Sequence, residues 1–181
     1  MQFEVSKKDV ADAHTPHNLF VSSLFLIDLM MSPAVIVLKL GMPGLMFTLM
    51  CSLSVMGYIY LRSRKSTTWF VDAHWRLSWS RARILLLGYT ISAVLIALAW
   101  LVSLTAHEAS MAHIMWTAMT RIALVPTLLF VLLTAIMEAS AIGVATKGEV
   151  PDKIIAAFPP PPEMKRRAEE LKELSTQLPP P

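Results

Sequence analysis

The chain has 181 residues, of which 55% are hydrophobic and 16% are charged, and its mean hydropathy is +0.55. Soluble domains usually carry about 25% charged residues, so this composition does not fit a water-soluble enzyme. The apolar content also excludes a chain that is disordered over most of its length, because too much apolar surface would be left in water.

Four apolar stretches are long enough to cross a bilayer, which takes about 20 residues of helix. Residues 44–61 and 84–106 carry no charge, and 122–144 carries only Glu138. The stretch 19–38 contains Asp28 and Pro33, and a charge at the bilayer centre costs about 2.5–3.5 kcal/mol. We predict an all-α, polytopic membrane bundle of four transmembrane helices with cytoplasmic tails. Three spans, with an interfacial first helix, are the alternative.

Charge and composition divide the chain into five segments. These are an N-terminal tail (1–18), a transmembrane helical hairpin that turns at 41–44 (19–61), a basic, Trp-rich elbow (62–83), a second transmembrane pair (84–144) and a Pro-rich tail (145–181). All basic residues except Lys39 and Arg121 lie in the tails or the elbow. Because Lys and Arg concentrate on cytoplasmic loops, both tails and the elbow are predicted to face the cytoplasm. No cleavable signal is expected, because the first 17 residues are polar.

The elbow interleaves aromatic and basic residues. Tryptophan prefers the headgroup zone, and nearby Arg attracts anionic lipid. We therefore predict an interfacial anchor made of Trp69, Trp75, Trp79, Arg76, Arg81 and Arg83. A docking surface for a cytoplasmic partner is the alternative. Nucleic acid is not expected as a partner, since the net charge of +3 follows from the topology and an elbow this close to the membrane leaves little room.

Three charged residues fall within or at the edge of the predicted spans: Asp28, Arg121 and Glu138. Charged residues inside membranes are costly, so they pair, snorkel to the interface or carry ions. We expect Arg121 to lie near the far-side end of the last span, where it snorkels or reaches toward Asp28. Glu138 is expected to reach the interface or to bond a neighbouring helix.

Small residues recur every fourth position in the last span, at Ala135, Ala139 and Gly143. This spacing lets two membrane helices approach closely. It favours helix packing, either within the bundle or between copies of the chain, and the pattern does not choose between them.

The C-terminal tail combines a proline run with a short helix. Residues 159–162 are four prolines and favour a stiff polyproline II spacer. Residues 163–178 follow as an amphipathic helix whose apolar stripe includes Met164, Leu171, Leu174 and Leu178. The stripe predicts docking onto a cytoplasmic partner, because so short a helix is marginal alone in water. A solvated tail is the alternative.

No metal, cofactor or catalytic site is predicted. His107-Glu108 and His113 lack the spacing of the H-E-x-x-H zinc motif, and the pair His14 and His17 is too sparse for a metal site. Cys51 is the chain's one cysteine, which excludes an internal disulfide.

The expected function is therefore that of a non-enzymatic subunit or scaffold of an inner-membrane assembly. A small polytopic protein with compact basic ends resembles the accessory subunits of larger inner-membrane assemblies. Secretion and conjugation machines are the first assemblies suggested by this analogy. Its expected partners are the lipid bilayer and other membrane subunits. The alternative is a small ion-coupled transporter or channel subunit that uses Asp28, Arg121 and Glu138.

Overall fold

The computed structural model describes residues 1–105 and 108–177, and the side chains of all of these except residues 42, 171, 172 and 174–177. Over this part of the chain, 83% of the residues are helical and none lies in a strand, which confirms the predicted all-α fold. Four of the described helices are long and apolar enough to cross a membrane: Lys7–Val37, Pro43–Arg62, Trp69–Ser103 and Ala109–Thr146. The protein is therefore a multi-pass membrane protein.

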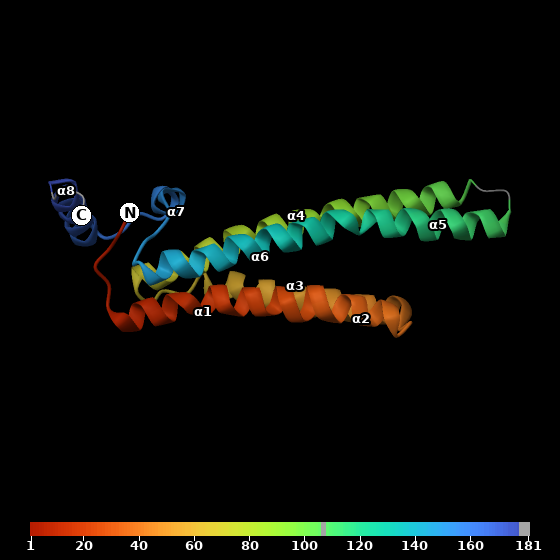
Figure 1. Cartoon of the computed structure of the whole chain (residues 1–181), viewed down its shortest axis with the longest axis horizontal. Coiled ribbons are helices and arrows are strands. Elements are labelled where there is room, and N and C mark those ends of the chain that lie inside the picture. The colour runs from red at the N-terminus through yellow and green to blue at the C-terminus, as the bar shows by residue number, and fades with distance from the viewer. Residues whose placement is uncertain (106–107, 178–181) are drawn as a thin grey trace. The chain divides into compact units, whose positions relative to one another are not determined.

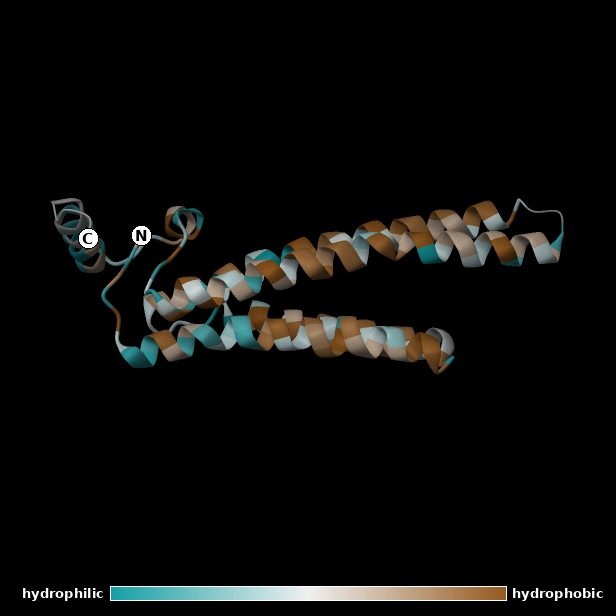
Figure 2. Ribbon diagram, viewed as in Figure 1, coloured by the Kyte–Doolittle hydropathy of each residue, from teal (hydrophilic) through white to brown (hydrophobic). Residues whose placement is uncertain are grey.

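Two compact units make up the fold, Met1–Ser80 with Met137–Pro181 (unit 1) and Arg81–Ile136 (unit 2). In chain order the helices are α1 (Lys7–Ser23), the π-helix η1 (Leu24–Met31), α2 (Ser32–Val37), α3 (Gly41–Arg62), α4 (Trp69–Ser103), α5 (Ala109–Ala123), α6 (Val125–Thr146), α7 (Asp152–Ala157) and α8 (Pro162–Gln177) (Figure 1). Helices α4 and α6 each contribute to both units. Apolar residues cover α2 and α3, whereas hydrophilic residues gather on α8 (Figure 2).

The first spanning helix is continuous through α1, η1 and α2, so residues 7–18 are helical and do not form the separate tail expected from the sequence. Ser6 caps its start by accepting a hydrogen bond from the backbone N–H of Asp9 at 3.1 Å. Pro33 does not end the helix. It comes two residues after η1, where the N–H of Ser32 bonds to the carbonyl of Ile27, five residues back. Because the bonding pattern is already wider than that of an α-helix here, the helix continues through a proline that has no N–H to donate.

The turn between α2 and α3 lies just before Gly41 and not at 41–44. Lys39 and Gly41 both have positive φ, of 53° and 63°. The two helices then approach closely, because a Cβ at Gly44 would lie 2.6 Å from Cγ1 of Val35. Glycine at this position therefore lets the hairpin close.

The two ends of the chain fold together in unit 1 as a terminal cap, defined here as residues 1–5 and 148–177. The N–H of Phe3 donates to the carbonyl of Gly148 at 2.8 Å, and the N–H of Val150 donates to the carbonyl of Met1 at 3.0 Å. The apolar core beneath the cap joins it to α1, α4 and α6 and comprises Phe3, Ala13, Phe70, Ala73, Leu77, Ala141, Ala145, Val150, Ile154 and Ala168. The C-terminal segment is thus part of the folded protein.

Unit 2 is a hairpin in which α4 runs beside α5 and α6 (Figure 1). Helix α6 starts next to Pro126, and its early N–H groups have no partner within the helix. The Oγ of Ser92 on α4 accepts from the backbone N–H of Thr127 at 3.2 Å and from its hydroxyl at 2.8 Å. This contact between helices gives a hydrogen-bond acceptor to a backbone N–H at the start of α6, in a largely apolar hairpin.

Gly88 fixes how closely the two sides of this hairpin pack. A Cβ at Gly88 would lie 2.6 Å from the Cβ of Phe130, so Gly88→Ala must push the helices apart. We expect a loss of about 1–3 kcal/mol of unfolding free energy, typical of overpacking, measured by thermal unfolding in detergent. The matched control is Gly57→Ala, because a Cβ at Gly57 meets nothing within 4 Å. Equal stability of the two variants would contradict this packing.

Candidate functional site

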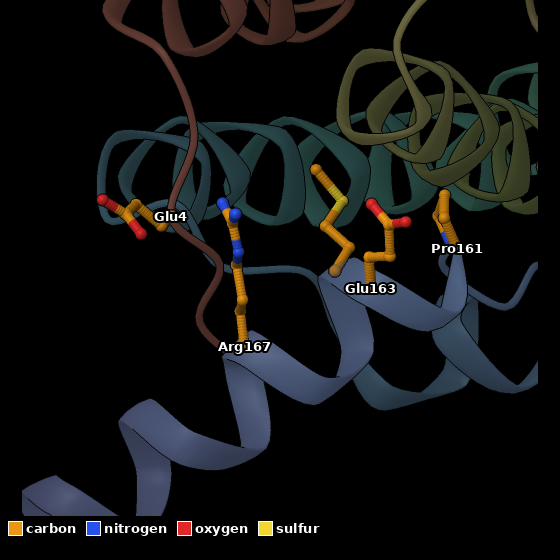
Figure 3. Close-up of a pocket in the computed structure, with 5 residues that line it drawn as sticks. Glu4, Pro161, Glu163 and Arg167 are labelled. Atoms are coloured by element: carbon orange, nitrogen blue, oxygen red, sulfur yellow. The ribbon is translucent and has the colours of Figure 1, made fainter.

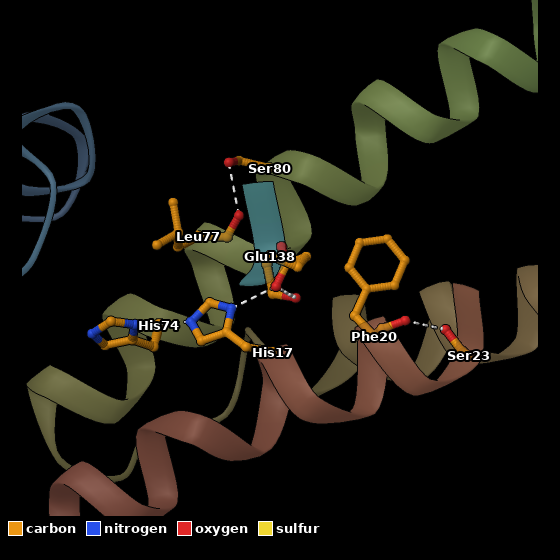
Figure 4. A network of polar contacts seen from close by, with 8 residues as sticks. His17, Phe20, Ser23, His74, Leu77, Ser80 and Glu138 are labelled. Carbon is orange, nitrogen blue, oxygen red and sulfur yellow. Dashed lines mark hydrogen bonds and ion pairs between the residues drawn. The ribbon is translucent and has the colours of Figure 1, made fainter. Parts of the chain in front are cut away.

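A buried polar cluster occupies the centre of unit 1. His17 comes from α1, His74 and Ser78 come from α4, and Glu138 comes from α6 (Figure 4). All four residues have 0% relative exposure. Burying polar groups is costly unless they bond to one another, so their contacts decide what the cluster can do.

The side chains form a series of hydrogen bonds. Nδ1 of His17 lies 2.5 Å from Oε2 of Glu138, and Nε2 of His17 lies 2.9 Å from Nδ1 of His74. Nε2 of His74 then lies 3.2 Å from the carbonyl oxygen of Glu149. The hydroxyl of Ser78 donates to the same Oε2 of Glu138 at 3.5 Å. The series thus runs from a buried carboxyl group to the backbone of the terminal cap.

The donors and acceptors in this series determine which of its contacts hold a proton. A carbonyl oxygen only accepts, so Nε2 of His74 carries a proton and donates it to Glu149. The contacts of His17 with His74 and with Glu138 each need one proton between their two atoms, because two bare lone pairs this close would repel. One proton therefore lies in each of these three contacts.

A proton can shift along this series without changing the net charge of the buried group. It can reside on the carboxyl group of Glu138 or on either imidazole, with each hydrogen bond retained in the opposite sense. The arrangement has two chemical capacities. It ties three helices together through polar contacts in a dry environment, and it provides a short path for a proton.

Of the three predicted intramembrane charges, only Glu138 belongs to this cluster. It bonds a neighbouring helix, which is one of the two arrangements expected for it. Asp28 lies 11 residues after His17 on the same helix, or about 16 Å along its axis. There it is half-buried in η1 and accepts a hydrogen bond from Ser52 at 3.4 Å. Irregular helix turns of this kind often mark functional positions.

Arg121 lies in unit 2, in the last turn of α5 and close to the junction with α6. Helix α5 begins at Ala109, so Arg121 lies well inside the hairpin and not at the edge of the last span. Its side chain is exposed, and it has no ion-pair or hydrogen-bond partner among the described residues. Sequence reasoning placed this residue at the edge of the last span, because α5 is weakly apolar and resembles a loop.

The six residues predicted as an interfacial anchor have different environments. Trp75 is 3% exposed and packs against Tyr58 with 5.9 Å between ring centroids, and Arg81 is 8% exposed. Arg76 lies over the ring of Phe158, 3.8 Å from its centroid. Trp69 and Trp79 are half-buried, and Arg83 is exposed. All six residues lie on α4, which begins at Trp69 and continues into the apolar stretch that follows.

Two of the three small residues on α6 face outward. Ala139 and Gly143 are exposed, and a Cβ at Gly143 would meet nothing within 4 Å. Ala135 is half-buried. The Ala139–Gly143 face is therefore not used for packing within unit 1.

The C-terminal stripe is used partly by the protein itself. Met164 packs against the core of unit 1, and Ala168 belongs to that core. The side chains of Leu171 and Leu174, and the whole of Leu178, lie outside the described residues. The opposite face of α8 carries the ion pairs Lys165–Glu169 and Arg166–Glu170. A hollow beside it is lined by residues of both charges, Glu4, Glu163 and Arg167 among them (Figure 3).

Sequence reasoning missed the two histidines as partners of Glu138. His17 was considered only together with His14, and His74 was not considered, because the two lie 57 residues apart. No local pattern marks residues that meet only through helix packing. In the described part of the chain, no group of three His, Cys, Asp or Glu side chains is arranged to hold a metal ion. Comparisons of the chain with protein-family models, with curated proteins and with solved structures found no match.

Proposed function

We propose that this protein is a non-enzymatic accessory subunit of a larger assembly in the inner (cytoplasmic) membrane, with both termini on the cytoplasmic side. A secretion or conjugation apparatus is the class of assembly we favour. The observation that carries the proposal is the exposed Arg121 in the apolar hairpin of unit 2.

The depth of Arg121 follows from the pairing of the hairpin. Thr127 bonds to Ser92, and the two sides of the hairpin run antiparallel. Arg121 comes six residues before Thr127, so it lies beside the part of α4 about six residues after Ser92. That level is about 20 Å along the helix from Arg83, the last basic residue before the apolar stretch of α4. A hydrocarbon core is about 30 Å thick, so Arg121 lies within the apolar layer or close to its far edge.

An arginine at this depth requires a counter-group. Exposure to lipid costs about 2.5–3.5 kcal/mol near the centre, and intramembrane Arg usually pairs with a carboxylate. A partner subunit that supplies a carboxylate satisfies this requirement. The open Ala139–Gly143 face of α6 supports the proposal further, because it allows a second helix to approach closely.

The test is co-purification of the tagged full-length protein in mild detergent, compared among three variants. Arg121→Leu is expected to lose its co-purified membrane proteins while the chain itself stays folded, because no described residue bonds to Arg121. Arg121→Lys is expected to retain part of them. Arg83→Gln is the matched control on the same hairpin. Unchanged partners in Arg121→Leu would mean that the arginine only snorkels to the headgroups, and the proposal would be wrong.

A second candidate is a small ion-coupled transporter or channel subunit. The hydrogen-bond series of His17, His74 and Glu138 favours it, because proton carriers use such chains of titratable groups. The test is proton flux into liposomes that contain the purified protein. Glu138→Gln and Asp28→Asn are expected to lower the flux at least tenfold, with His113→Gln as control. Equal flux in all four proteins would reject this candidate.

A further inference from the structure

The turn between α3 and α4, residues 63–68, presents two cations without counter-charges. Arg64 and Lys65 are both exposed, and neither has an ion-pair partner among the described residues. The neighbouring acid is already engaged. Asp72 accepts hydrogen bonds from the backbone N–H and the hydroxyl of Thr67, at 2.9 Å and 2.7 Å, and it lies 3.9 Å from Nη1 of Arg62. Its charge therefore compensates Arg62.

The turn has a defined conformation. The N–H of Arg64 donates to the carbonyl of Leu61, and the N–H of Lys65 donates to the carbonyl of Arg62 at 3.1 Å. The hydroxyl of Ser63 closes the end of α3 by donating to the carbonyl of Tyr60 at 2.7 Å. The two exposed cations are thus projected from a backbone that is already ordered, which lowers the entropy cost of binding a ligand.

Aromatic rings fix the orientation of one of the two cations. The guanidinium of Arg64 lies 4.7 Å from the centroid of the Tyr60 ring, and that ring packs against Trp79 with 4.8 Å between centroids. A guanidinium held over a ring keeps its N–H groups available for a two-point contact with a phosphate. Tyr and Trp are also the residues that mark the headgroup level of a membrane.

The position of the turn selects the ligand. The apolar helix Pro43–Arg62 ends directly before it, so Arg64 and Lys65 lie where phospholipid phosphates are found. We propose that Arg64, Lys65 and the Tyr60–Trp79 pair form a binding site for the headgroup of one anionic phospholipid in the adjacent leaflet. Arg64 makes the two-point contact with the phosphate, and Lys65 supplies the second positive charge. This site is independent of any partner subunit.

Native mass spectrometry of the purified full-length protein, with phosphatidylglycerol and phosphatidylcholine offered in equal amounts, tests the site. The wild-type protein is expected to retain one phosphatidylglycerol in preference to phosphatidylcholine. Each basic residue near an anionic surface contributes about fivefold in affinity, so Arg64→Gln with Lys65→Gln should weaken retention by about 25-fold. Arg64→Lys should weaken it less, since it keeps the charge and loses the planar contact.

The control is a double variant with the same change in net charge, Lys165→Gln with Arg166→Gln, whose cations are paired with glutamates on α8. It should retain phosphatidylglycerol as the wild type does. Equal retention of the two lipids by the wild-type protein, or equal loss in both double variants, would overturn the proposal. Displacement of the lipid by an equal concentration of inorganic phosphate would also overturn it, because the site would then bind a soluble phosphate.

Discussion

His17→Ala is expected to lower the unfolding free energy of the protein by about 2–6 kcal/mol, because two buried polar groups each lose a hydrogen bond at a cost of about 1–3 kcal/mol. The ring of His17 joins the carboxyl group of Glu138 to the ring of His74, and all three side chains are fully buried. Removing the ring leaves buried polar atoms on α4 and α6 that lose these hydrogen bonds and do not regain bonds to water. The measurement is the thermal unfolding midpoint in detergent.

His113→Ala is the matched control, because His113 is exposed in unit 2. Its unfolding midpoint should stay within the experimental error of the wild-type value. A similar midpoint for His17→Ala and His113→Ala would show that the buried cluster does not hold the three helices together.

Glu138→Gln tests whether an amide can replace the carboxyl group in the cluster. If a proton lies between Glu138 and His17, an amide can replace the carboxyl group, because its N–H donates to Nδ1 of a neutral imidazole. We therefore expect a loss of about 1 kcal/mol or less, far below that of His17→Ala. A loss as large as that of His17→Ala would contradict this replacement.

Gly148→Ala is expected to detach the N-terminal segment from the terminal cap. Gly148 has φ of +68°, and an added Cβ would lie 2.7 Å from the carbonyl oxygen of Phe3. An L-residue in this conformation costs about 1–2 kcal/mol, and overpacking adds about 1–3 kcal/mol. Because Phe3 packs on Trp69 with 4.9 Å between ring centroids, limited proteolysis near the N-terminus and a change in tryptophan fluorescence should report the detachment.

Gly143→Ala, five residues earlier and inside α6, serves as the control for this substitution. It adds the same methyl group in open space, where alanine favours the helix by up to about 1 kcal/mol over glycine. Its N-terminus should stay as resistant to protease as that of the wild-type protein. Equal cleavage of the two glycine variants would show that the cap does not depend on the close approach at Gly148.

The sequence predicted the structural elements better than the contacts between them. The helix predicted from residue 163 corresponds to α8, because a proline start and an apolar stripe are local signals. The length of the first helix was underestimated, because polar residues 7–18 resemble a tail. They are helical in a structure where Ala13 and His17 are buried against other helices. Tertiary packing thus overrides local polarity.

The candidate site could be predicted only in part. Glu138 attracts attention because a carboxyl group in an apolar stretch is costly, and that cost is visible in the sequence. Its partner His17 lies 121 residues away, and nothing in the spacing of the chain connects the two. The anchor residues show the same limit. Trp75 is of a residue type that is common at membrane interfaces, yet it is buried against Tyr58 of α3.

By itself, the sequence determined that this protein crosses a membrane and that its fold is helical, because both follow from the free energy of placing apolar residues and backbone groups in lipid. Only the tertiary structure decided which polar groups meet in the interior and which face outward. Those contacts depend on how the helices rotate and pack against one another, and that rotation is set by residues far apart in the chain, such as Gly88 against Phe130.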